Sequence, residues 1–397
     1  MSQELIYRNP ELQQLQNDGY EIEVRGGLLI VHHIPYLNSN LEMLTGTLIM
    51  PLETTGDIIK RPNSHTAHWV GQQPCNKDKS YIPSLVNKAE RKDFGQGLLS
   101  NFFLSCHPDS KKGYDTYYEK ITTYFNTISA PAYNFDKSKF CELRESIVIH
   151  STESPLRYDD TNASRAGIVG INERLSSYRV AIVGLGGTGS YLLDFIAKTP
   201  VSEIHLYDDD SFDTHNAFRA PGAPDITQLR THPFKVDYLS EIYGHMHSGI
   251  VGHKIRITKD NISELKNMDI VFVCVDDQSI RNYISSYLAD NDITFIDSGM
   301  GLEYSTDRLS GLVRVTTGFY GHYEHLKDSY GDDLADIDNN AAYRTNIQIA
   351  ELNALAAVLS IIQWKRMIGF YHDQTDGYLN FLYSVAGNNI IHQKYEN

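Results

Sequence analysis

The sequence has 397 residues, with 35 lysines and arginines against 50 aspartates and glutamates, which gives a formal net charge of −15. This acidic balance argues against a protein that binds a nucleic-acid backbone, because such binding needs a basic face, but it does not exclude a small phosphate ligand. Hydrophobic residues make up 41% of the chain and charged residues 21%, which excludes wholesale disorder, and the length predicts two domains.

The first part of the chain, residues 1–148, predicts an α+β domain. Short β-like runs separated by turn residues indicate an antiparallel meander, and apolar residues at a spacing of three and four predict a closing helix. The expected elements are a helix at 10–16, strands at 27–34, 44–50 and 66–70, and a helix at 114–128.

A polar, proline-containing stretch at residues 149–164 predicts a linker, and the pattern then changes to alternating strands and helices over 165–397. The continuous apolar run at 180–183 is typical of a parallel strand that is buried on both faces. This alternation predicts an α/β domain with a doubly wound, Rossmann-like, mostly parallel sheet. The expected elements are strands at 180–183, 203–207, 270–275 and 293–297, and helices at 191–198 and 346–364.

A glycine-rich motif, Gly184-Leu-Gly186-Gly187-Thr-Gly189, follows the first of these strands and opens a helix. Glycines permit a tight turn and let backbone amides approach a phosphate at the N-terminus of the helix. The motif therefore predicts a nucleotide site, although alone it fits a dinucleotide equally well.

Polar residues placed after the next strands separate these two possibilities. Asp208 ends the second strand, where an acid suits ribose hydroxyls, and Asn216, Arg219, Lys235 and Asp276 follow. A hydride-transfer site needs no such cluster. A site that cleaves a triphosphate needs cations for the leaving pyrophosphate and a carboxylate for Mg²⁺. The pattern favours triphosphate chemistry, with an NAD(P)- or FAD-dependent oxidoreductase as the alternative.

The ordered set Gly-x-Gly-Gly-x-Gly, Asp-x-Asp, Asn-x-x-Arg, Lys and Cys-x-Asp resembles the adenylating domain of ubiquitin-activating enzymes and their bacterial relatives, the ThiF, MoeB and HesA proteins. The resemblance covers about residues 165–390. It implies that ATP and Mg²⁺ are used, that the four glycines of the motif form the nucleotide loop, and that Asp208 binds the ribose.

The resemblance also implies roles for the cluster that follows. Asp210 and Asn216 would line the phosphate site, whereas Arg219 and Lys235 would contact the triphosphate and stabilise the charged transition state. Asp276 would hold Mg²⁺. The implied reaction is attack of the C-terminal carboxylate of a ubiquitin-like protein on the α-phosphorus of ATP, which requires no covalent enzyme group.

Family members are generally homodimers, and a partner subunit often supplies an arginine from a helix before the first strand. Arg165 and Arg174 both precede that strand, and we favour Arg165 for this catalytic role. We therefore expect a homodimer. The order helix, meander, helix in residues 1–148 is similar to that of ubiquitin-conjugating enzymes. This similarity implies a ubiquitin-conjugating-like or partner-binding domain and a ubiquitin-conjugating-like protein as a further partner, but specifies no active site.

The four cysteines set the chain apart from ubiquitin-activating enzymes, which usually form a thioester beyond the Mg²⁺-binding strand. Cys274 lies within an apolar strand and no cysteine follows it. The acyl group would then pass to another protein, to Cys75, Cys106 or Cys141, or to a serine such as Ser329 in the acidic segment 319–344. The chain has no Cys-x-x-Cys pair, so no zinc knuckle is expected, and four cysteines in 397 residues do not make a disulfide scaffold.

Two functions within the adenylation class stay open: a bacterial-type ubiquitin-like conjugation pathway and adenylation of a sulfur-carrier protein for cofactor biosynthesis. A third alternative is an inactive adenylating fold that serves as a binding module. The N-terminus lacks the pattern of a secretory signal, and no apolar run approaches the roughly 18 residues of a membrane helix. We therefore expect a cytoplasmic protein that binds neither membranes nor nucleic acid.

Overall fold

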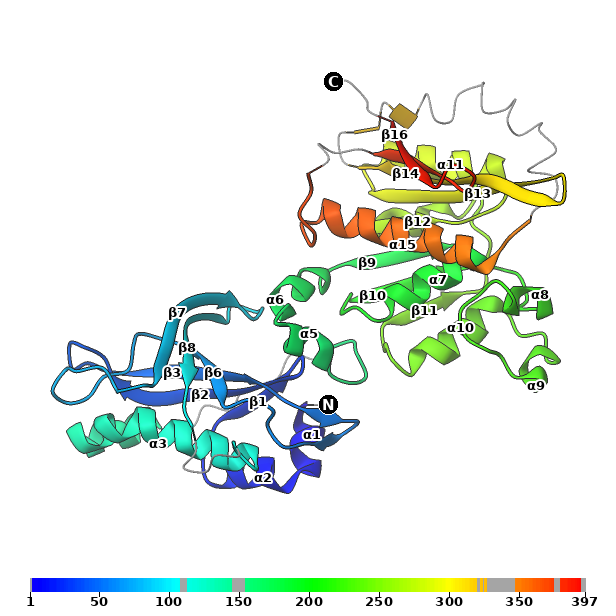
Figure 1. Ribbon diagram of the computed structural model, residues 1–397. Helices are drawn as coiled ribbons and strands as arrows, with labels where there is room; N and C mark the ends of the chain where they lie inside the picture. The colour runs from blue at the N-terminus through cyan, green and yellow to red at the C-terminus, as the bar shows by residue number, and fades with distance from the viewer. Residues whose placement is uncertain are drawn as a thin grey trace. The chain divides into compact units, whose positions relative to one another are not determined.

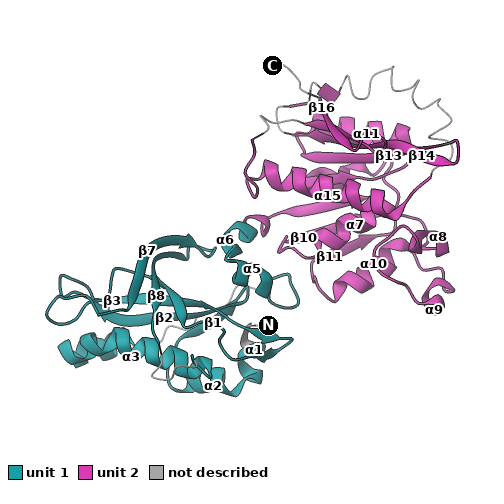
Figure 2. Ribbon diagram, in the orientation of Figure 1, with its two compact units in different colours: residues 1–173 teal, residues 174–397 magenta. Residues whose placement is uncertain are grey.

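The chain divides into two units, Met1–Glu173 and Arg174–Asn397 (Figure 2). The computed structural model describes residues 2–107, 113–144, 154–319, 322–323, 325–326, 347–374 and 379–393. The first residues of the predicted linker, the segment 327–346 and Ser329 therefore lie outside the described residues. None of the described helices is long and apolar enough to cross a membrane.

Unit 1 contains a six-stranded antiparallel sheet with the order β1-β2-β3-β6-β8-β7 (Figure 1). The sequence pattern predicts three of these strands, at 27–34, 44–50 and 66–70, and gives no prediction of β1, β7 or β8. A separate pair of short strands, β4 and β5, forms a small hairpin. The strands are β1 (Ile22–Arg25), β2 (Leu28–Leu37), β3 (Met43–Pro51), β4 (Thr54–Thr55), β5 (Ile58–Ile59), β6 (Thr66–Val70), β7 (Val86–Asp93) and β8 (Leu99–Ser105).

The long helix α3 (Tyr117–Phe135) covers one face of this sheet and contributes Ile121, Tyr124 and Ile128 to the core. It begins after Thr116, whose side chain accepts a hydrogen bond from Glu119 N at 3.0 Å, as expected for an N-cap. The described residues of the unit also form five shorter helices. They are α1 (Ser2–Arg8), α2 (Pro10–Asn17), α4 (Lys137–Leu143), α5 (Thr161–Ala166) and α6 (Val169–Asn172).

The opposite face of the sheet packs against α5 and α6, which supply Ala163 and Val169 to a cluster with Leu28, Ile30 and Phe94. Residues 165–173 are therefore part of unit 1, on the N-terminal side of the division. Helices and an antiparallel sheet together confirm the predicted α+β class of this region.

Unit 2 contains an eight-stranded sheet with the order β11-β10-β9-β12-β13-β14-β15-β16. The first five strands in this order run parallel, and β13 to β16 pair antiparallel. This confirms the predicted mostly parallel sheet. The strands are β9 (Arg179–Val183), β10 (Glu203–Tyr207), β11 (Ile250–His253), β12 (Ile270–Val273), β13 (Phe295–Ser305), β14 (Arg308–Gly318), β15 (Asn380–Ser384) and β16 (Asn389–Gln393).

Helices cover both faces of the parallel part of the sheet. The helices α7, α10 and α15 contribute to one core, with Leu192, Leu239 and Ala357, whereas α11 and η2 contribute Ile284 and Leu265 to the other. Burial on both faces explains why β9 and β12 are apolar throughout. The helices are η1 (Glu173–Leu175), α7 (Gly187–Ile196), α8 (Thr214–Ala217), α9 (Ile226–Leu229), α10 (Lys235–Gly244), η2 (Ile262–Asn267), α11 (Gln278–Asp290) and α15 (Ala350–Met367).

The position of β9 determines where a ligand would bind. β9 pairs with β10 on one side and with β12 on the other, so the chain reverses direction across the sheet at this strand. In open α/β sheets, ligands bind outside the carboxyl ends of the strands at this point of reversal. The glycine motif, the aspartates after β10 and the residues after β12 all follow these carboxyl ends.

Candidate functional site

A cleft with two connected parts lies at the carboxyl ends of β9, β10 and β12. The parts have volumes of about 120 and 280 Å³, and together they fall within the size range of small-molecule sites. We call the smaller part, next to Asp208–Asp210, the aspartate pocket, and the larger part the Asn353 pocket. Both parts are lined by Gly186, Cys274, Val275, Asp276 and Gln348.

Glycine is needed at different positions of the motif for different structural reasons. Gly184 has a φ of +93°, and a Cβ there would lie 2.7 Å from Cys274 O. A Cβ on Gly189 would lie 1.9 Å from Gly184 O, so these two glycines allow the strand, the turn and α7 to pack closely. A Cβ on Gly186, by contrast, would have nothing within 4 Å among the described residues.

Gly186 is also the N-cap of α7, and no side chain in the described part of the chain caps the helix there. The first backbone N–H groups of a helix have no partner within it, and the helix dipole adds a partial positive charge at this end. Gly186, Gly187 and Thr188 line the Asn353 pocket, and Gly186 lines the aspartate pocket as well. The turn therefore presents the geometry that binds phosphate at many helix N-termini.

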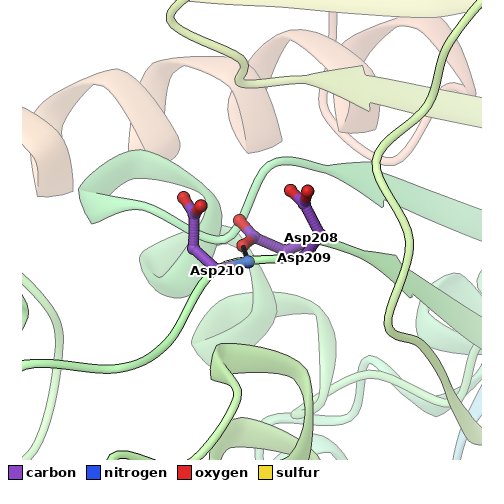
Figure 3. A group of neighbouring side chains, drawn as sticks. All are labelled: Asp208, Asp209 and Asp210. Atoms are coloured by element: carbon purple, nitrogen blue, oxygen red, sulfur yellow. Dashed lines mark hydrogen bonds between the residues drawn. The ribbon is translucent and has the colours of Figure 1, made fainter.

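Asp208 is buried at the end of β10 and ties this strand to the glycine turn. Its Oδ2 accepts a hydrogen bond from Leu185 N at 2.7 Å, and its Oδ1 accepts one from Asp210 N at 2.9 Å. Figure 3 shows Asp208, Asp209 and Asp210 side by side after the strand, with the second of these bonds dashed. Because a carboxylate oxygen accepts more than one hydrogen bond, Asp208 retains capacity for a ribose hydroxyl.

Two cations offset part of the negative charge of these three carboxylates. Lys235, buried at the start of α10, lies with its Nζ 2.7 Å from Asp210 Oδ2 and 3.3 Å from Asp208 Oδ1. The hydrogen bond from Lys235 lowers the pKa of the Asp210 carboxyl. Arg256, which follows β11, lies with its Nε 3.1 Å from Asp209 Oδ1. Lys235 lines the aspartate pocket, where it binds the carboxylates of Asp208 and Asp210 in this structure.

Arg219 lines the aspartate pocket and is half-buried. Its Nε is buried and has no hydrogen-bond partner among the described residues. Burial lowers the pKa of its guanidinium, and Asp276 opposes this effect. A buried donor without a partner costs about 1–3 kcal/mol, so Arg219 is prepared for a polar ligand. Asn216 is instead buried in the capping box of α8, where its Oδ1 accepts a hydrogen bond from Asp213 N at 2.9 Å.

Asp276 is exposed and lines both parts of the cleft. Its neighbour Asp277 caps α11 by accepting a hydrogen bond from Ile280 N at 3.1 Å, so Asp276 has no capping role there. Among the described residues, the one acidic group compact enough for a metal ion is Asp208, Asp209 and Asp210, whose ligand atoms lie within 4.8 Å of one another. Lys235 and Arg256 offset two of its three negative charges, and Asp276 is not part of it.

The predicted arginines before β9 have other partners. Arg165 lies on α5 in unit 1, with its Nε 3.7 Å from Glu53 Oε2. Arg174 begins unit 2 and donates a hydrogen bond to Gly369 O, just beyond α15. Neither contact involves a residue that lines the cleft, and the catalytic role of Arg165 stays a prediction.

The cysteines differ strongly in their surroundings. Cys274 Sγ lies 3.6 Å from Ser298 Oγ, and burial raises the pKa of its thiol to about 12, so it is neutral at physiological pH. Burial also raises the pKa of Cys75, whereas Cys106 is half-buried and Cys141 exposed. The ring of His107, the residue after Cys106, stacks on the ring of His65, with the ring centroids 3.8 Å apart.

Several residues of the cleft carry no signal that sequence reasoning detected. Arg256 follows β11, a four-residue strand too short to recognise, although its place after a parallel strand is the expected one. Arg281 of α11 and Arg314 of β14 both line the Asn353 pocket, and both bind the buried carboxylate of Asp297. The Arg314–Asp297 hydrogen bond is 2.8 Å long. Asn353 of α15 lines the same pocket. Only the three-dimensional fold brings these residues to the glycine turn.

The donor set fits ATP. The open space at Gly186, the uncapped N-terminus of α7 and the orphaned Nε of Arg219 are suited to phosphate oxygens. Asp276 offers the oxygen ligand that Mg²⁺ prefers, together with substrate phosphates. The residues present therefore fit both groups.

Two family profiles match the chain. The profile of the ThiF family matches residues 161–392, and one described as a domain of unknown function, DUF6791, matches residues 10–161.

Curated relatives match a shorter stretch. Ubiquitin-like modifier-activating enzyme 5 of Oryza sativa subsp. japonica is 27% identical over 165 residues, which is 38% of this chain and 38% of the relative. The Arabidopsis thaliana protein of the same name is 26% identical over 194 residues, which is 45% of this chain and 43% of the relative. The chain thus spans about two fifths of the length of these relatives.

Among solved structures, E. coli MccB with succinimide has a TM-score of 0.46 at 19% identity and covers 68% of this chain and 81% of its own. PaaA has a TM-score of 0.43 at 16% identity, and the match covers 56% of this chain and 75% of the PaaA chain.

Proposed function

The chain belongs to the ThiF family, as its motifs suggest, and on this basis we propose that it is an ATP-dependent adenylyltransferase. Its substrate in this proposal is the C-terminal carboxylate of a ubiquitin-like protein. The curated relatives, named ubiquitin-like modifier-activating enzymes, support this substrate class over the matched part of the chain.

One observation carries the proposal: the cleft assembles the parts that a triphosphate needs, from five separate segments of the chain. Gly186 supplies the amide turn, Asp208 a ribose partner, and Arg219 and Lys235 positive charge, while Asp276 supplies an oxygen ligand. An oxidoreductase would leave Arg219, Lys235 and Asp276 without a role. The proposal therefore favours cleavage of a phosphoanhydride over hydride transfer.

In the proposed reaction, a carboxylate oxygen of the substrate forms a bond to the α-phosphorus of ATP. The bond from that phosphorus to the bridging oxygen breaks, and pyrophosphate leaves with the electron pair. Arg219 and Lys235 would neutralise the charge that develops on the leaving group, which is the main task of such a site. Lys235 would do so by exchanging its contact with Asp210 for a phosphate oxygen. Mg²⁺, held by Asp276, would supply further neutralisation of the phosphates.

The acyl-adenylate product would then react outside the parallel sheet of unit 2. The Cys274 thiol is neutral and packed against Ser298, so it lacks the thiolate needed for attack. We propose transfer to another protein or to a group elsewhere in the chain, in a ubiquitin-like conjugation pathway with a ubiquitin-conjugating-like partner. Adenylation of a sulfur-carrier protein is the alternative that ends at the same step. The homodimer and the cytoplasmic location are part of this proposal.

Exchange of labelled pyrophosphate into ATP tests the proposal. The chain is incubated with Mg²⁺, ATP, labelled pyrophosphate and candidate ubiquitin-like proteins that end in a free carboxylate. We expect exchange that requires the candidate and that Asp276→Ala abolishes. Asp290→Ala, an exposed change at the far end of α11, is the matched control and should retain exchange. Absence of exchange with every candidate, or equal exchange by Asp276→Ala, would contradict adenylation at this site.

A further inference from the structure

Asn353 stands out among the residues of the cleft because it comes from α15, far along the chain from the glycine motif. Its side chain is 1% exposed and lines the Asn353 pocket together with Gly186, Gly187 and Thr188. Its Oδ1 accepts a hydrogen bond from the Thr188 hydroxyl at 3.0 Å. This bond joins α15 directly to the first turn of α7.

The nitrogen of this amide finds no hydrogen-bond partner in the part of the chain that the structure describes. Asn353 Nδ2 is buried and makes no hydrogen bond among the described residues. Buried N–H groups in proteins are nearly always paired, because an unpaired donor loses its hydrogen bonds to water without compensation. An orphaned donor in the wall of a ligand cleft therefore points to a ligand acceptor.

The packing of Gly187 shows that the amide has a defined place. A Cβ on Gly187 would lie 2.2 Å from Asn353 Nδ2 and 2.5 Å from its Oδ1. No side chain larger than hydrogen fits there while Asn353 keeps its position. Gly187 is thus required by the approach of α15, a reason distinct from those of Gly184 and Gly189.

The place of Asn353 determines what kind of ligand atom it can meet. The ten-residue helix α7 begins at Gly187 and directs its uncapped first N–H groups to this part of the cleft. Anionic oxygens are the ligands that such a helix end attracts. Arg281 and Arg314 line the same pocket, so its wall is rich in donors.

We propose that Asn353 Nδ2 donates a hydrogen bond to a phosphate oxygen of ATP at the N-terminus of α7. This inference rests on the proposed function, because it requires ATP in the cleft. Asn353 is then a nucleotide-binding residue supplied by α15, and the Thr188 hydroxyl orients it.

Calorimetric titration of the full chain with Mg·ATP and with adenosine tests the inference without an acyl substrate. Asn353→Ala removes the amide donor, and Asn353→Asp replaces it with a negatively charged carboxylate oxygen, which repels phosphate. We expect Mg·ATP binding to weaken about 10-fold in the first variant and up to about 100-fold in the second, as for loss of a hydrogen bond to a charged group. Adenosine binding should be unchanged in both. ADP and AMP show which phosphate is contacted.

Two further variants separate binding from folding. Ser360→Ala changes another buried polar residue of α15, whose hydroxyl bonds to Ala356 O, and should leave Mg·ATP binding unchanged. Thr188→Val removes the group that orients the amide, and should weaken Mg·ATP binding less than Asn353→Ala does. Thermal unfolding should show that Asn353→Asp keeps the fold, because its carboxylate faces the N-terminus of α7.

The possible failures are distinguishable. If the unchanged chain binds Mg·ATP and Asn353→Ala and Asn353→Asp bind it equally well, the inference is wrong and the proposed function stands. The inference is also wrong if thermal unfolding shows that Asn353→Asp is folded and its affinities for Mg·ATP and for adenosine fall to the same extent. If the unchanged chain binds no Mg·ATP, the proposed function is wrong and the inference falls with it.

Discussion

Gly186 and Gly189 lie three residues apart in the glycine turn, yet their replacement by alanine should have opposite consequences. A Cβ on Gly186 meets nothing within 4 Å among the described residues, whereas a Cβ on Gly189 lies 1.9 Å from Gly184 O. We expect Gly186→Ala to preserve the fold and impair ATP binding, and Gly189→Ala to destabilise unit 2 itself.

The magnitudes follow from the local geometry. Gly186 has an ordinary φ of −69°, so alanine there gains about 0.4–1 kcal/mol from the unfolded state and loses a few tenths of a kcal/mol or more as an N-cap. The net change in the free energy of unfolding should stay within about 1 kcal/mol. Gly189→Ala forces backbone to move and should cost about 1–3 kcal/mol or more.

The loss of binding has a separate origin. A methyl group on Gly186 projects into the open space beside the N-terminus of α7 and keeps phosphate oxygens from its N–H groups. Loss of one such charged hydrogen bond costs about 1.5–3 kcal/mol, which is about a 10- to 100-fold loss of affinity.

The assay combines calorimetric titration of Mg·ATP with thermal unfolding. Each unit contains one of the two tryptophans, Trp69 in unit 1 and Trp364 in unit 2. In a Trp69→Phe background, fluorescence reports the unfolding of unit 2 alone. Wild-type affinity in Gly186→Ala would refute the phosphate site at this turn, and an unfolded Gly186→Ala would refute the packing on which the comparison depends.

Three further predictions concern other groups. Burial lowers the pKa of Lys120 to about 7, whereas the pKa of a lysine in the unfolded chain is about 10.4. Between these pH values the unfolded state binds one proton more than the folded state, so unit 1 should gain up to about 1.4 kcal/mol of stability for each pH unit of increase. Lys120→Met in a Trp364→Phe background should abolish this gain, measured by thermal unfolding with Trp69 fluorescence. Lys235→Met leaves the buried carboxylate of Asp208 without its cation and should lower the stability of unit 2 by about 3–5 kcal/mol, measured by urea unfolding. Cys274→Ala should leave pyrophosphate exchange intact. Loss of exchange in this variant would indicate a role for the thiol.

The fold of unit 2 could be predicted because its signals are local. The apolar runs at β9 and β12 and the residues of β10 follow from burial on both faces of a parallel sheet. The polar strand β7 (Val86–Asp93) escaped prediction because it lies at the edge of its sheet, where one strand side has no partner and polar residues are tolerated.

The candidate site was predictable where its residues follow strands in a recognisable order. Asp208 and Asp276 follow the carboxyl ends of β10 and β12, and they line one pocket with Arg219 and Lys235, as expected at this edge of a parallel sheet. The contribution of Asn353 was not predictable, because it depends on how α15 packs against the glycine turn. Such contacts between distant segments leave no spacing pattern in the sequence.

Identification of the nucleotide products tests adenylation most directly. The full chain is incubated with Mg·ATP, a candidate ubiquitin-like protein and hydroxylamine to release the acyl group, and the products are separated and quantified. Attack at the α-phosphorus yields AMP and pyrophosphate in equal amounts, with none formed by Arg219→Ala. Formation of ADP and phosphate instead would mean that a different bond is broken and would contradict adenylation.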